Sequence, residues 1–332
     1  MTRSILVTGG AGYIGAHACK ALAKAGYLPV VYDNLSTGHE DFVRWGPLVE
    51  GDIRDTAAVS AALRSYGTVA VMHFAAKAYV RESIIDPAKY YDNNVSGTLS
   101  LLAGMRTAGC CDIIFSSTCA VYGEPALMPI DESTPAAPVN PYGASKLMAE
   151  RILADYQRAY DLRAICLRYF NASGADDAAE IGELRDPESH LIARAMMALQ
   201  GHIHDFQLFG TDFRTPDGTA IRDYIHVVDL ADAHCAALEL LLRSGLTGVF
   251  NLGTGVGCSV KQVLDAVQAV ARRALPAIAG SPQPGDPPQL VADPALAKRV
   301  LGFSPTRSDL RNIVETAWAW HLKAHPYRNR PE

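Results

Sequence analysis

The sequence predicts an α/β fold, with a doubly wound parallel sheet followed by a smaller C-terminal α/β lobe. Short apolar segments alternate with helix-like segments of about ten residues or more as far as residue 170. The alternation ends after Asn171. A chain of 332 residues also favours two packed lobes over a single core.

The first half contains six apolar segments that are typical of buried parallel strands. They are expected at Ser4–Thr8, Leu28–Tyr32, Leu48–Val49, Val69–Phe74, Ile113–Ser117 and Ala164–Leu167. Gly26 is a helix-ending signal and Pro141 is a helix-starting signal. Helices are expected at Ile14–Ala25, Thr56–Ser65, Pro87–Ala108 and Pro141–Tyr160.

The second half has a less regular pattern, and residues 172–220 show no clean alternation. Later strands are expected at Tyr224–Val228 and Val249–Leu252, later helices at Leu230–Leu242, Pro294–Leu301 and Asp309–His321, and a loop at Pro282–Pro288. We expect residues 1–170 to form one domain and residues 171–332 a second. Part of about 220–255 is expected to return to the first domain.

Composition places the chain among globular proteins and argues against several other classes. Apolar residues make up 49% of it and charged residues 20%, with a formal net charge of −5. We expect no nucleic-acid partner, because the chain is mildly acidic and lacks a dense Lys/Arg run. No apolar segment approaches a membrane span, and the N-terminal segment fits a strand better than a signal peptide. Seven scattered cysteines without a CxxC pair fit a reducing, cytoplasmic setting.

A glycine-rich turn follows the first predicted strand and opens the first predicted helix. Gly10-x-Gly12-x-x-Gly15 permits a tight turn and a close approach of the backbone to a diphosphate. Gly9 offers a second register. The helix N-terminus would face the phosphates with free N–H groups. Asp33 ends the next strand, where a carboxylate binds the adenosine ribose and repels a 2′-phosphate. The pattern predicts a Rossmann-type domain that binds NAD rather than NADP.

Asp52 and Ile53 follow the third predicted strand. They could hold the adenine amino group and pack against its ring, or Asp52 could simply cap the loop.

Tyr142 and Lys146 lie four residues apart, on one face of a predicted helix. An ammonium nearby favours the phenolate form of a tyrosine, whose ordinary pKa is about 10. A phenolate can take a proton from a substrate hydroxyl while hydride leaves the carbon. Thr118 ends the fifth strand and could hydrogen-bond the oxygen that becomes a carbonyl, or it could satisfy only the backbone. The same spacing occurs in surface pairs, so the position within a dinucleotide fold is what favours catalysis.

An ordered series of motifs resembles the extended short-chain dehydrogenases/reductases, and within them the UDP-glucose 4-epimerase (UDP-galactose 4-epimerase) family. The motifs include LVTGGAGYIG, DNLS, EGDIRD, HFAA, YYDNNVSGT, FSSTCAVYG, NPYGASK, LRYFN, DGTAIRDYIHVVDLADAH and NLGTG. The resemblance implies tightly bound NAD, a UDP-sugar substrate and a 4-keto intermediate. Tyr142 would be the base for the 4-hydroxyl, with Lys146 on the nicotinamide ribose. It also implies a homodimer through helices near Val95–Ala108 and Pro141–Tyr160.

The resemblance completes the set of expected contacts, and no metal site is expected. The expected cofactor-binding residues are Gly9, Gly12, Tyr13, Ile14, Gly15, Asp33, Asn34, Ser36, Asp52, Ile53, Phe74, Ala75, Ala76, Asn94, Ser116, Tyr142, Lys146 and Tyr169. The expected substrate-binding residues are Thr118, Tyr142, Asn171, His190, Leu191, Phe209, Arg222 and Asp286. Arginine suits bidentate phosphate contact, although Arg222 could instead pair with Asp223.

Four positions depart from the family pattern. Ala78 and Gln283 stand where many members have Lys and Arg, which bears on the affinity for NAD and UDP. Thr118 replaces the commoner Ser. Leu290 stands where some members have a Tyr closing the sugar pocket, so UDP-pentoses and UDP-N-acetylhexosamines are alternative substrates.

Three other functions are compatible with parts of this pattern. A 4,6-dehydratase needs an acid–base pair after Thr118, but Cys119 and Ala120 stand there. A 4-ketoreductase often accepts NADPH, which Asp33 disfavours. A non-catalytic NAD-binding scaffold would not need both Tyr142 and Lys146.

Overall fold

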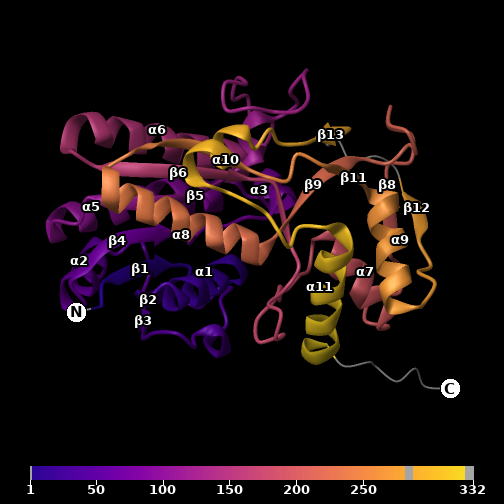
Figure 1. Ribbon diagram of the computed structural model, residues 1–332, viewed down its shortest axis with the longest axis horizontal. Helices are drawn as coiled ribbons and strands as arrows, with labels where there is room; N and C mark the ends of the chain where they lie inside the picture. The colour runs from indigo at the N-terminus through magenta and orange to yellow at the C-terminus, as the bar shows by residue number, and fades with distance from the viewer. Residues whose placement is uncertain (1, 281–286, 326–332) are drawn as a thin grey trace.

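The computed structural model describes residues 2–280 and 287–325 (Figure 1). Its main sheet has seven strands in the order β10-β6-β5-β4-β1-β2-β3, and every neighbouring pair is parallel. The predicted doubly wound parallel sheet is therefore confirmed. Its strands are β1 (Ser4–Thr8), β2 (Leu28–Asp33), β3 (Leu48–Glu50), β4 (Thr68–His73), β5 (Asp112–Thr118), β6 (Arg163–Tyr169) and β10 (Gly248–Leu252).

Helices cover both faces of this sheet (Figure 1). One face packs against α1 (Tyr13–Lys24), α8 (Val227–Ser244) and α10 (Ala295–Leu301) through a core that includes Leu22 and Leu238. The other face packs against α2 (Thr56–Ser65), α5 (Gly97–Ala108) and α6 (Pro141–Tyr160) through a core that includes Leu63 and Leu101. Strand β10 and helix α8 come from the second half of the sequence but pack on the first sheet.

A second lobe lies at one end of the main sheet (Figure 1). Its helices α7 (Leu191–Leu199), α9 (Val260–Ala271) and α11 (Leu310–Ala324) share one apolar core. Strand β9 (Ile221–His226) pairs with β7 (Asn171–Ser173), β11 (Gly257–Ser259) and β13 (Gln289–Leu290). Strand β8 (Gln207–Phe209) pairs with β12 (Ile278–Gly280).

Several elements differ from the prediction. The segment after Asn171 does contain regular elements, namely β7, α7 and β8. Helix α9 was not predicted, although Ser259 and Gln262 form a capping box at its start. The expected helix at Pro87–Ala108 is confirmed but is interrupted by a π-helical turn, so that it consists of α4 (Pro87–Tyr90), η2 (Tyr91–Ser96) and α5. Short helices also form at α3 (Val80–Ile85), η1 (Glu40–Phe42) and η3 (Cys119–Tyr122).

Parallel strands bring their carboxyl ends to one edge of the sheet, and ligands of such folds bind at that edge. The ends of β1, β2, β4 and β5 therefore bring together the glycine turn, Asp33, Phe74 and Ser116. Within the described residues, no helix is both long and apolar enough to cross a membrane.

Candidate active site

A cavity of about 490 Å³ opens at this edge. Such a volume is typical of small-molecule sites. Of the expected cofactor-binding residues, all line it except Asp52 and Asn94. Residues far apart in the sequence, from Gly9 to Tyr169, thus share one wall.

The glycine turn is fitted to a close approach by phosphate. A Cβ on Gly15 would lie 2.2 Å from the carbonyl oxygen of Gly9, so only glycine allows the turn to close. Gly9 itself has φ of +73°, a conformation that L side chains rarely adopt. Gly12 is the N-cap of α1, and no side chain caps its first N–H groups. These groups, at the positive end of the helix dipole, suit an anionic diphosphate.

Asp33 lies at the end of β2, where its carboxylate is fixed by the backbone. One carboxylate oxygen accepts a hydrogen bond from the Ala11 N–H at 3.0 Å, and the other accepts one from the Leu35 N–H at 2.9 Å. Burial raises the pKa of Asp33, and these backbone hydrogen bonds oppose that shift. The carboxylate keeps further lone pairs for a ligand hydroxyl.

Asp52 does not line the cavity. Its carboxylate accepts hydrogen bonds from Arg54 at 2.7 Å and from the Asn34 side chain at 3.0 Å. The hydrogen bond from Arg54 is the main reason why the pKa of Asp52 lies below its usual range. Ile53, in contrast, does line the cavity. The carboxylate of Asp52 is thus already engaged by residues of its own loop and of the loop after β2. These contacts are of the kind expected of a loop-capping aspartate.

Asn94 lies behind the cavity wall, within the π-helical turn. It is buried, and its side chain bonds both the N–H and the C=O of Lys77, at 2.8 and 3.0 Å. A third hydrogen bond joins it to Ser145 Oγ at 3.0 Å. Asn94 therefore holds the wall segment at Lys77 against helix α6.

The pair Tyr142 and Lys146 lies on the first turns of α6, which Asn140 caps by accepting a hydrogen bond from Gly143 N–H at 2.9 Å. Lys146 is buried, and its Nζ donates to the Ser116 carbonyl oxygen at 2.8 Å. Burial lowers the pKa of Lys146 to about 7. Burial also raises the pKa of Tyr142, while a hydrogen bond with Thr118 opposes that shift.

Further groups surround this pair. The ring of Tyr90 lies edge-on to Tyr142, with centroids 6.5 Å apart. Ser116 and Tyr169 are joined through their hydroxyls, and both line the cavity. A phenol, a buried amine and several hydroxyls therefore meet in one partly enclosed space. This combination is suited to moving a proton to or from a substrate hydroxyl.

Of the expected substrate-binding residues that the structure describes, Tyr142 alone is among those lining this cavity. Thr118 ends β5 and accepts a hydrogen bond from Ala120 N–H at 3.1 Å. The others that are described belong to the second lobe, as the start of β7 (Asn171), the start of α7 (His190 and Leu191), the end of β8 (Phe209) and strand β9 (Arg222). Asp286 and Gln283 lie outside the described residues. The neighbour of Arg222, Asp223, accepts hydrogen bonds from Thr254 and Gly255 N–H at 2.8 and 3.0 Å.

Sequence reasoning missed some residues of the wall. Lys77 and Tyr79 lie in the segment between β4, which ends at His73, and α3, and the end of a strand was a usable signal for them. Leu184, Arg185 and Asp186 come from the irregular segment between β7 and α7. No periodic pattern marks that segment, so nothing in the sequence placed it against the cavity.

Known proteins resemble this chain over nearly its whole length. The UDP-glucose 4-epimerase of Rhizobium leguminosarum bv. trifolii is 49% identical over 324 residues, 98% of this chain and 99% of that protein. The UDP-glucose 4-epimerase of Rhizobium meliloti (strain 1021) is 51% identical over 320 residues, 96% of this chain and 97% of that protein.

Solved structures resemble it equally well. UDP-glucose 4-epimerase from Brucella ovis in complex with NAD has a TM-score of 0.94 and 53% identity, covering 96% of this chain and 98% of that one. The enzyme from Stenotrophomonas maltophila with bound NAD and formylated UDP-arabinopyranose has a TM-score of 0.94 and 37% identity, covering 97% and 98%. The model of the NAD dependent epimerase/dehydratase family matches residues 5–253. With that match and relatives that align almost end to end, the chain belongs to the NAD dependent epimerase/dehydratase family.

Proposed function

We propose that the protein is an NAD-dependent 4-epimerase of UDP-sugars that interconverts UDP-glucose and UDP-galactose. One observation carries this proposal: Tyr142 and Lys146 line the same cavity as the glycine turn and Asp33. A dinucleotide held by the turn therefore shares its space with an acid–base group. The near full-length likeness to UDP-glucose 4-epimerases supports the choice of reaction.

The residues present suit NAD. The uncapped N-terminus of α1 would hold its diphosphate, and Asp33 would accept hydrogen bonds from its adenosine ribose. Lys146 would hold the nicotinamide ribose. NAD, when bound there, would supply the hydride acceptor and donor by which C4 of the sugar could be oxidised to the 4-keto form and reduced again on its opposite face.

Tyr142 performs the proton transfer in this proposal. Its phenol oxygen takes the proton of the 4-hydroxyl as C4 is oxidised and gives it back as the carbonyl is reduced. Thr118, joined to Tyr142 by a hydrogen bond, holds the same sugar oxygen. Lys146 favours the phenolate, because a cation stabilises the charged form of a neighbouring phenol.

The second lobe supplies the UDP contacts. We propose that residues 1–170 bind NAD and residues 171–332 bind the UDP-sugar, with β10 and α8 belonging to the first unit. Asn171, His190, Leu191, Phe209 and Arg222 would contact UDP. Because these side chains come from a different lobe than Tyr142, the sugar would lie between the two.

The direct test needs only the purified protein. We expect it to release NAD on denaturation and to equilibrate UDP-glucose with UDP-galactose without added cofactor. Tyr142→Phe is the matched control, since it should keep NAD and lose the interconversion. A wild-type protein that is loaded with NAD but interconverts neither sugar would contradict the proposal.

The substrate range depends on Leu290. Its side chain is buried in one apolar cluster with Cys119, Tyr122 and Phe170, beside the end of β5. Leu is smaller than the Tyr that the family resemblance implies for some members and has no hydroxyl, so the sugar pocket should be wider. We propose that UDP-pentoses or UDP-N-acetylhexosamines are also substrates. The same assay with these sugars tests this, and conversion of hexoses alone would contradict it.

Two helices suit a homodimer. Leu99 on α5, with Met148 and Tyr160 on α6, is exposed on the outer face of the first unit, by 40, 43 and 45% respectively. Pairing of this face with its copy would bury these side chains. Light scattering should give twice the chain mass, and Leu99→Asp with Met148→Asp should give the monomer. Leu322→Asp on α11, also exposed by 40%, is the control and should not change the mass.

We also propose a cytoplasmic location, since all seven cysteines are free thiols. Cell fractionation tests this proposal.

A further inference from the structure

Arg185 is a cation in the cavity wall that no motif of the sequence indicated. It lies between β7 and α7, beside Leu184 and Asp186, which also line the cavity. About 18% of its side chain is exposed. An arginine so placed has little contact with bulk water, so the groups around it decide what its charge does.

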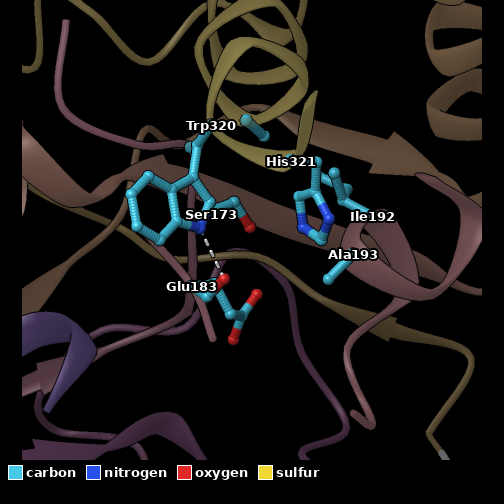
Figure 2. Close-up of a pocket in the computed structure, with 8 residues that line it drawn as sticks. Ser173, Glu183, Ile192, Ala193, Trp320 and His321 are labelled. Carbon is cyan, nitrogen blue, oxygen red and sulfur yellow. Dashed lines mark hydrogen bonds between the residues drawn. The ribbon is translucent and has the colours of Figure 1, made fainter. Parts of the chain in front are cut away.

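The inner side of Arg185 is held firmly by the second lobe. Its Nε lies 3.0 Å from a carboxylate oxygen of Glu183, which also contacts His190 Nδ1 at 2.6 Å. The indole N–H of Trp320 donates to the backbone carbonyl of Glu183 at 2.8 Å (Figure 2). A Cβ on Gly182 would lie 2.3 Å from the Trp320 ring, so the loop packs directly on α11. The position of Arg185 is therefore set by packing.

The outer side of Arg185 faces the tyrosines of the cavity. Its guanidinium lies 5.6 Å from the centre of the Tyr79 ring. Burial raises the pKa of Tyr142 and of Tyr169, and the charge of Arg185 opposes both shifts. The positive charge thus reaches the end of the cavity where the proposed base lies.

The terminal nitrogens of Arg185 are available to a ligand. In the part of the chain that the structure describes, its one ion pair is with Glu183, through Nε. Arg185 donates one further hydrogen bond, to the hydroxyl of Tyr79. A guanidinium carries five N–H donors in a fixed fork, so donors remain for a second anion.

We propose that Arg185 binds a diphosphate in this cavity through its terminal nitrogens. The inference rests on the proposed function, which brings two diphosphates here, one in NAD and one in the UDP-sugar. The guanidinium fork matches phosphate oxygens, and a buried site strengthens the contact. A metal ion is the competing occupant, because ligand atoms of Glu183, Glu188 and His190 lie within 4.8 Å of one another. The guanidinium, paired with Glu183, already supplies the positive charge there.

The test compares Arg185→Gln and Arg185→Lys with Arg194→Gln in the NAD-loaded protein. Arg194, on α7, donates to the carbonyl oxygen of Glu188 at 3.2 Å. It therefore contacts the loop that carries Arg185 but does not line the cavity. The readouts are NAD retained after purification and inhibition constants for UDP and for uridine. Loss of a charged hydrogen bond predicts about 10- to 100-fold weaker UDP binding in Arg185→Gln, or a similar loss of NAD affinity. The affinity of Arg185→Lys for the same ligand should lie between that of Arg185→Gln and that of wild type. The Lys variant also provides the test if Arg185→Gln folds poorly.

The two sources of diphosphate give different results. Weakened UDP binding with unchanged uridine binding and full NAD content identifies the substrate diphosphate, whereas loss of NAD identifies that of the cofactor. Equal losses for UDP and uridine, or the same losses in Arg194→Gln, overturn the proposal, because the loop and not the charge would be responsible. Unchanged UDP and NAD binding in both Arg185 variants also overturns it. A wild-type protein that binds no UDP would instead contradict the proposed function.

Discussion

Replacing Lys146 with Met should abolish turnover and at the same time stabilise the protein freed of dinucleotide. Burial lowers the pKa of Lys146 from 10.5 to about 7. A difference of this size corresponds to about 5 kcal/mol against folding when the amine is protonated. Met removes that penalty and fills a similar volume. The change leaves the Ser116 carbonyl without its 2.8 Å donor and removes the contact with the Phe115 ring, which together lose about 2 to 3 kcal/mol. A net gain of about 2 kcal/mol at pH 7 remains.

The pH dependence gives the sharper measurement. Because the folded-state pKa of Lys146 lies below the unfolded-state value, the folded chain binds fewer protons than the unfolded chain between pH 7 and 10.5. The free energy of unfolding contributed by this group therefore rises with pH across that window, by up to about 1.4 kcal/mol per pH unit. Lys146→Met has no such group. Its advantage over wild type should be greatest below pH 7, should vanish at about pH 8.5 and should become a disadvantage of about 2 kcal/mol by pH 10, where only the lost contacts remain.

Urea unfolding of both proteins from pH 6 to 10 measures this difference. Other titrating groups are common to the two chains and cancel in the comparison. A difference that stays constant with pH would refute the reasoning, because it would mean that Lys146 titrates normally in the folded chain. A Met variant less stable than wild type at pH 6 would show that the lost contacts outweigh the buried charge.

Four further predictions test other parts of the site. Tyr142→Phe should lower turnover by about 10²- to 10⁴-fold with NAD still bound, and activity within a few-fold of wild type would remove Tyr142 from its role. Asp33 should make the protein retain NAD, and mass spectrometry that finds mostly NADP would contradict this. Gly15→Ala should abolish NAD retention, since its Cβ would lie 2.2 Å from a carbonyl oxygen, whereas Gly248→Ala, with its nearest neighbour at 3.4 Å, should retain it. Leu290→Tyr should raise the ratio of kcat/KM for UDP-hexoses to kcat/KM for UDP-pentoses and UDP-N-acetylhexosamines. If these ratios equal those of wild type, Leu290 does not limit the pocket.

The main sheet was predictable because each of its strands follows a strong local rule. Apolar segments bounded by glycine, proline or acidic residues predicted β1, β2 and β5 within a residue or two at each end. The glycine turn and Tyr142 follow from fixed spacings, and neither depends on distant parts of the chain. Local signals were thus enough where one strand and the next helix build the feature.

The second lobe was less predictable because its strands are very short. Strands β7, β8 and β11 have three residues each and are formed by pairing with distant partners. No period can be read in so few positions. The segment that carries Arg185 has the same difficulty, since its place depends on the packing of Gly182 against Trp320, 138 positions later in the numbering (320 minus 182). Such a contact has no local signature.

The two buried cations explain why cofactor and fold should depend on each other. Lys146 and Arg185 both line the cavity, and burial disfavours the charge of each. Glu183 offsets the charge of Arg185, but Lys146 contacts a carbonyl oxygen and an aromatic face, neither of which carries a full negative charge. Any anion that enters the cavity lowers the free energy of both groups, so a dinucleotide with its diphosphate stabilises the folded state as it binds. We therefore expect the electrostatics of the cavity, as well as the shape of the glycine turn, to favour retention of the cofactor.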